Sequence, residues 1–119
     1  MSRLSSILLA VFILFVFSCT KDTATSSVDC PAITPTYKND IAVIMSASCA
    51  TACCHSAASR SGGIDVSSYA ATLKAVSNSR FLPSIKHQSG AQSMPQGAGK
   101  LSDPTIAKIE CWISNGTPE

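Results

Sequence analysis

The apolar residues of this sequence are concentrated near its start, and this limits what the remainder can fold into. Residues 7–17 form an unbroken apolar run, preceded by Arg3. A bilayer span needs roughly 20 such residues, whereas a basic start with about 7 to 15 apolar residues is typical of an export signal. Once residues 1–18 are set aside, the remaining aromatic residues are Tyr37, Tyr69, Phe81 and Trp112. Since a small domain buries a low fraction of its surface, we expect disulfides, a metal or a large cofactor to complete the core.

The end of the apolar run resembles the lipobox of bacterial lipoproteins. Val16-Phe17-Ser18-Cys19 supplies the aliphatic residue, the variable residue, the small residue and the cysteine of that motif. The resemblance implies cleavage before Cys19 and lipid attachment to its sulfur and amine, and membrane affinity grows with each buried CH₂. It implies a lipid-anchored protein of the Gram-negative cell envelope, in the periplasm or at the outer-membrane surface. Simple secretion after cleavage nearby is the alternative.

The mature chain is predicted to consist of a tether followed by one helical domain. Residues 19–36 are rich in Ser, Thr and Pro and have no periodicity, which is typical of a tether. From residue 37 the pattern changes, and apolar positions recur at helical spacing from Ile41 to Met45. No run alternates with period 2 for long enough to form a strand. We therefore expect residues 37–119 to be all-α, with about three or four short helices and long loops.

The last helix has the clearest boundaries in the sequence. Ser102 is a suitable N-cap, Pro104 fits the first turn and Gly116 can end the helix. Its apolar face is made by isoleucines, with Trp112 at the flank, and Cys111 falls nearly opposite that face. Residues 66–76 are predicted to form another helix, and residues 77–100, with two prolines and three glycines, are predicted to be mostly loop.

The segment Cys49-Ala50-Thr51-Ala52-Cys53-Cys54-His55 carries the chemistry of the sequence. A Cys followed directly by His, with another Cys shortly before, is the attachment pattern of c-type haem. The two thiols form thioethers with the haem vinyl groups, and the following His binds the iron. Cys49 and Cys54 give a gap of four residues, C-x4-C-H. Cys53 is excluded as the first attachment residue because adjacent thiols do not easily reach two separate vinyl groups.

A haem iron in an electron carrier takes a second axial ligand from the opposite side. Met94, followed by Pro95 in the long loop before the last helix, is the candidate, and a thioether ligand raises the reduction potential. His87 in the same loop is the rival ligand, with a surface role as its alternative. Arg80 and Lys86 could neutralise haem propionates or be ordinary solvated charges.

Together these features resemble the small single-haem cytochrome c domains of bacterial lipoproteins. Residues 37–118 share with that family an N-terminal helix, the C-x4-C-H site, a Gly-Gly segment, a Met-Pro pair and a closing helix. The resemblance implies a cytochrome c-like fold around one covalent haem c. It implies thioethers at Cys49 and Cys54, His55 as proximal iron ligand and Met94 as distal ligand. It also implies that the first and last helices pack against each other.

Three cysteines remain once lipid and haem are assigned: Cys30, Cys53 and Cys111. An exported protein can form disulfides. A Cys30–Cys111 bridge is our hypothesis, because Cys30 lies just before the first helix and Cys111 lies on the last. A Cys30–Cys53 pair is the competing possibility.

The sequence therefore predicts one-electron transfer by a membrane-anchored monohaem cytochrome, not an enzyme, with redox proteins of the cell envelope as partners. A net charge of +2 with 13% charged residues argues against nucleic-acid binding. If the sixth iron site is open, a haem-based gas sensor or weak peroxidase is expected instead. The alternative from another class is a disulfide-stapled surface interaction lipoprotein without haem. A structural zinc site is disfavoured because it needs four ligands, usually as two pairs.

Overall fold

Every regular element in the computed structural model is a helix, within the residues that it describes, 28–119. A 3-10 turn, η1 (Cys30–Ala32), precedes the first helix, which begins as a π-helical turn, η2 (Tyr37–Ile41), and continues as α2 (Ala42–Ser48). The later elements are a 3-10 turn, η3 (Ser61–Gly63), and the helices α3 (Tyr69–Val76), α4 (Phe81–Ile85) and α5 (Asp103–Ser114). Residues 28–119 contain no strand, so the all-helical prediction is confirmed for them.

The predicted signal peptide, the lipidation site at Cys19 and the first part of the tether lie outside the described residues. In the part that the structure does describe, no helix has both the length and the apolar character needed to cross a bilayer.

Serine caps fix where two of the helices begin. The Ser102 hydroxyl accepts a hydrogen bond from the Thr105 amide at 3.3 Å, and Pro104 stands in the first turn of α5, as predicted. Ser68 accepts from the Ala71 amide at 3.3 Å. Because an N-cap residue lies outside the helical conformation, α3 begins after Ser68 and not at residue 66, where the sequence pattern placed it.

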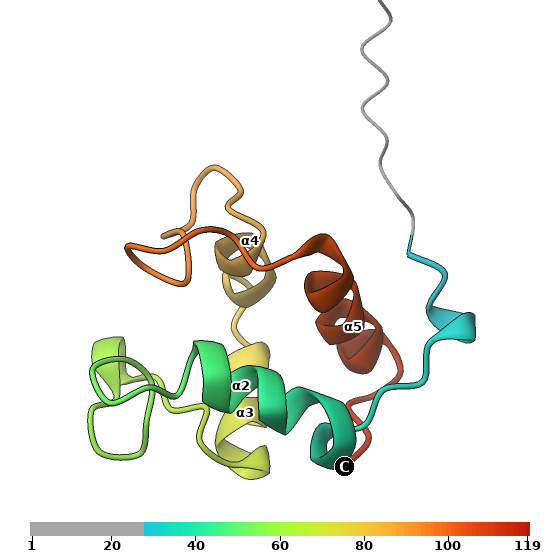
Figure 1. The fold of residues 1–119 in the computed structure, drawn as a ribbon, viewed down its shortest axis with the longest axis horizontal. Coiled ribbons are helices and arrows are strands. Elements are labelled where there is room, and N and C mark those ends of the chain that lie inside the picture. Colours follow the sequence, from blue (N-terminus) through green and yellow to red (C-terminus); the bar gives the residue numbers. More distant parts are fainter. Residues whose placement is uncertain (1–27) are drawn as a thin grey trace, which may run out of the picture.

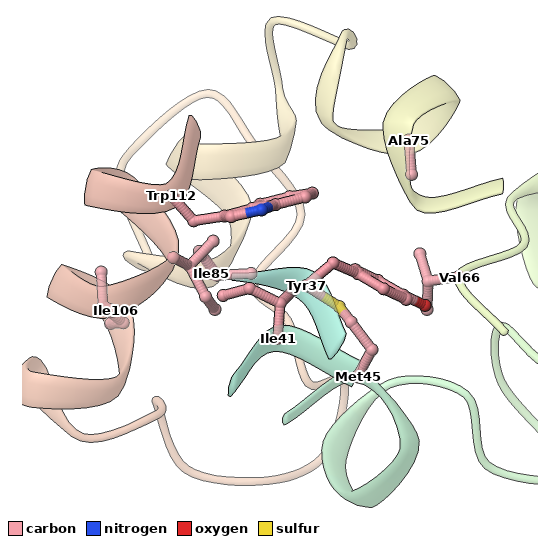
Figure 2. Packing of buried hydrophobic residues seen from close by; sticks show 9 residues of the cluster. Tyr37, Ile41, Met45, Val66, Ala75, Ile85, Ile106 and Trp112 are labelled. Atoms are coloured by element: carbon pink, nitrogen blue, oxygen red, sulfur yellow. The ribbon is translucent and has the colours of Figure 1, made fainter. Parts of the chain in front are cut away.

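The core lies between the first helix and α5, around one tryptophan. Trp112 and Ile109 of α5 and Ile41 of the first helix are all fully buried. Figure 2 shows Trp112 facing Tyr37 and Ile41, and the Tyr37 and Trp112 ring centroids are 6.0 Å apart. The indole Nε1 donates to the Pro118 carbonyl at 2.8 Å, so the polar edge of the ring is satisfied where it is buried.

Cys111 is a correction to the helical-wheel prediction, which placed it away from the packed face. It is fully buried, because the segment before η2 covers that side of α5. Cys111 forms a disulfide with Cys30, with their Cα atoms 4.9 Å apart. The Asn115 side-chain amide donates to the Ile33 carbonyl at 3.0 Å. The last residues of the predicted tether are thus attached to the helical domain.

The predicted long loop also contains an unpredicted helix, α4. Pro83 occupies its first turn, where amides have no partner within the helix, so the proline costs no hydrogen bond. The helix ends in a Schellman arrangement, in which the Gln88 amide donates to the Pro83 carbonyl at 2.9 Å and the His87 amide donates to the Ser84 carbonyl at 3.2 Å. His87 occupies the left-handed position of that motif, with φ +54°.

The elements place two long loops on one side of the molecule. Figure 1 shows the loop after α2 (green) and the loop after α4 (orange) on the side away from the C-terminus. Residues from both loops line one shared cavity. The chemistry predicted from the sequence falls on these two loops.

Candidate haem-binding site

The C-x4-C-H segment folds into a closed turn at the end of α2. The Cys49 amide still donates to the Met45 carbonyl at 2.9 Å, and the Cys49 carbonyl then accepts from the His55 amide at 3.0 Å. A further bond joins the Cys54 amide to the Thr51 carbonyl at 3.0 Å. The backbone therefore returns on itself and brings the first cysteine close to the Cys-His pair.

The three cysteines of this turn differ in exposure. Cys49 is partly buried and packs against the hydrophobic core, whereas Cys53 and Cys54 are exposed, and all three are free thiols. Burial raises the pKa of the Cys49 thiol to about 11, and repulsion from Cys54 adds to the effect. Since the thiolate is the reactive form, Cys49 is mostly in the unreactive thiol form at neutral pH.

His55 is oriented by its ring nitrogen Nδ1. This atom lies 3.3 Å from the Ile64 carbonyl oxygen, which can only accept, so Nδ1 carries the donated proton. In the neutral ring Nε2 is then the atom with a free lone pair. The Val66 amide donates to the His55 carbonyl at 2.9 Å and fixes the backbone as well. A metal-binding histidine usually donates from its other ring nitrogen to a backbone carbonyl or a carboxylate.

Met94 is held by α4. Its amide donates to the Ser84 carbonyl at 3.0 Å. Its carbonyl accepts from the His87 Nε2 at 3.0 Å. The rival ligand His87 therefore uses Nε2 for a backbone bond, and it lines neither of the cavities that contain His55 and Met94.

Two cavities meet at Cys49, His55 and Met94, which line both of them. The apolar cavity, of about 100 Å³, is otherwise lined mainly by hydrophobic residues and by Arg80: Ile64, Val66, Asn78, Arg80, Phe81, Ser84 and Ile85. The thiol cavity, of about 70 Å³, has no charged lining residue and is completed by Ser48, Cys53, Cys54, Ser61, Pro95 and Gln96. The four residues that the sequence predicts to bind haem, Cys49, Cys54, His55 and Met94, thus line one or both of these cavities.

The side chains at the site are of the types that bind haem c, whereas the two cavities are smaller than a porphyrin needs. The fit comes from two cysteines that line the thiol cavity, an imidazole whose Nδ1 is bonded to Ile64 so that Nε2 keeps its lone pair, and a methionine that lines both cavities. Ligand sites usually enclose roughly 300 to 1,000 Å³, more than either cavity holds. The two loops would have to separate to admit a porphyrin. The predicted disulfide partners Cys30 and Cys111 lie elsewhere, across α5 from the first helix.

The charges near the site are few. Arg80 is exposed and lines the apolar cavity, which is compatible with a role near propionates. Lys86 instead pairs with Glu110 at 2.6 Å, so its charge is already partnered.

The parts of the site that the sequence did not indicate are mostly backbone atoms. The Ile64 and Ser84 carbonyls orient His55 and Met94, and any residue type supplies a carbonyl, so no sequence signal exists for them. The apolar wall formed by Phe81 and Ile85 was missed because α4 was predicted as loop.

Comparisons with protein-family models, with curated proteins and with solved structures found no match to this chain. Within residues 28–119 no three His, Cys, Asp or Glu side chains come together in a way that could hold a metal ion. A haem iron differs from such an ion, because the porphyrin supplies most of its ligands and the protein adds only the axial pair.

Proposed function

We propose that this protein binds one haem c covalently and carries single electrons in the cell envelope. Cys49 and Cys54 would form the thioethers, and His55 and Met94 would be the axial ligands. The observation that carries the proposal is the orientation of His55. Its Nδ1 is bonded to a carbonyl while its ring lines the same cavities as Met94 and Cys49.

Bound haem would supply an iron that alternates between the ferric and ferrous states. The residues of this chain set the conditions for that change. The thioether sulfur of Met94 favours the ferrous state and raises the potential. The carbonyl of Ile64 increases the basicity of the His55 ring through Nδ1. The apolar wall formed by Phe81 and Ile85 would exclude water from one side of the haem.

The location and partners follow from the predicted lipidation at Cys19. A lipid anchor would hold the helical domain near the membrane, where redox proteins of the envelope are its partners. The described part of the tether begins two residues before Cys30, which is joined to Cys111 of α5 by the disulfide, so the anchor would attach on the α5 side. Figure 1 places the two site loops on the opposite side from the C-terminal end of α5.

The Cys30–Cys111 disulfide also supports the second candidate, a stapled surface interaction lipoprotein without haem. A bridge of this kind is expected in either protein, so it does not separate the two. The orientation of His55 favours the haem protein, because a domain stapled only by disulfides has no need of an imidazole with a free Nε2 beside two thiols.

Substitution of the distal ligand tests the axial pair. Met94→Ala should lose the low-spin spectrum of the oxidised protein, and its reduced form should bind carbon monoxide readily. The matched control His87→Ala should keep the low-spin spectrum. The reverse pattern would assign the distal position to His87. Ready binding of carbon monoxide by the unaltered protein would instead indicate an open sixth site, as in a gas sensor or weak peroxidase.

A further inference from the structure

A histidine occupies a backbone position that normally belongs to glycine. His87 is the residue after the C-cap of α4, in the Schellman arrangement described above, with φ +54°. Glycine is preferred there, and asparagine follows, because a Cβ is disfavoured at positive φ. The conformation therefore costs free energy that a glycine would not cost, and such strain persists where the surroundings require it.

The ring of His87 makes one contact that glycine could not make. Its Nε2 lies 3.0 Å from the Met94 carbonyl oxygen. The Ser84 carbonyl, in the same helix end, accepts from both the His87 amide at 3.2 Å and the Met94 amide at 3.0 Å. Both polar backbone atoms of Met94 are thus bonded to one short stretch, residues 84–87.

We propose that His87 is a positioning residue, which holds the Met94 thioether at the shared cavity by donating a hydrogen bond to the Met94 carbonyl. The inference rests on the proposed function, in which Met94 is the distal ligand. With its backbone fixed on both sides, Met94 loses little freedom when its sulfur binds. Without the His87 bond the segment 92–96 would open more often and release the sulfur.

Two substitutions separate this role from simple helix capping. His87→Asn keeps a residue that tolerates positive φ, but its amide is too short to reach the Met94 carbonyl. His87→Gln keeps a donor near the position of Nε2 but tolerates positive φ less well. If His87 only caps the helix, His87→Asn should be less disruptive than His87→Gln. If His87 positions Met94, His87→Gln should be the less disruptive of the two.

The measurements are amide hydrogen exchange at Met94 and carbon monoxide binding to the reduced haem protein. We expect both to be about fivefold faster in His87→Asn than in the unaltered protein, the ratio that one net hydrogen bond represents. His87→Gln should lie within about twofold of the unaltered protein. Exchange at the Ile109 amide, in the core, should be unchanged in both variants.

Two results would overturn the proposal. Unchanged Met94 exchange in His87→Asn would show that the ring does not hold the loop, and loss of the low-spin spectrum in that variant would make His87 an iron ligand. A protein purified without haem would contradict the proposed function and, with it, the role of His87 towards iron. Met94 exchange in that protein would still show whether His87 fixes the loop.

Discussion

The two halves of this molecule are built in different ways. The helical core, formed by the first helix and α5 around Trp112, consists of fully buried side chains and is closed by a disulfide. The site loops, residues 49–63 and 86–100, are largely exposed and are held mainly by backbone hydrogen bonds. We therefore expect the helical core, which contains none of the proposed haem-binding residues, to provide most of the free energy of unfolding. The residues that we propose to hold haem lie on the second half, the exposed site loops.

The largest effect on stability is expected from Trp112→Ala. Trp112 is fully buried and also bonds the Pro118 carbonyl, so its removal should cost about 5 kcal/mol of unfolding free energy. Denaturant unfolding measures this loss. The control Val43→Ala alters an apolar side chain that is 63% exposed and should change stability by less than about 0.5 kcal/mol. Equal losses in both variants would mean that the core is not centred on Trp112.

The disulfide should have the next largest effect. Replacing the pair by Cys30→Ser with Cys111→Ala opens a bridge between residues 81 positions apart. The chain-entropy model gives a loss of about 4.5 kcal/mol. Haem content measured under conditions where the variant is still folded should not change, since the bridge lies away from the site loops. The control Cys53→Ser, at an exposed free thiol, should leave the unfolding midpoint unaltered. Loss of haem from this variant while it stays folded would show that the site loops depend on the disulfide, contrary to the separation described above.

A surface ion pair should matter least. The hydrogen bond from Lys108 at 3.0 Å, and then the bond from the Thr36 amide, lower the pKa of Asp40. A lowered pKa contributes stability above the ordinary pKa of the carboxyl, and this contribution is lost as the pH falls through the lower, folded value. Because the pair is partly exposed to solvent, Asp40→Asn should cost less than about 1 kcal/mol near neutral pH. Unfolding curves of the variant and the unaltered protein should converge in acid, and a constant difference would exclude the charge as its cause.

The sequence predicted that the core is helical, but it was less successful for the burial of single residues and for the short helix α4. The cap at Ser102 and the helix that follows it carry local signals, and both are present in the structure. Cys111 was misplaced because a helical wheel shows only the faces of one helix and not the segment that covers the other side. Residues 81–85 were predicted as loop because Pro83 was treated as a helix breaker, although a proline is tolerated in a first turn.

The site was predictable where side chains carry the chemistry. The C-x4-C-H spacing and the Met-Pro pair singled out Cys49, Cys54, His55 and Met94, and the structure brings them to the same pair of cavities. The role of His87 was not predictable, because it depends on a positive φ and on a bond to a backbone carbonyl. Neither of these leaves a pattern in the sequence.

The central claim is covalent haem on Cys49 and Cys54. The most direct test is the intact mass of the protein produced in a host that attaches haem to exported proteins. We expect one added haem, which survives denaturation and is absent from the double variant Cys49→Ser, Cys54→Ser. A polypeptide of unmodified mass, recovered folded from that host, would contradict it.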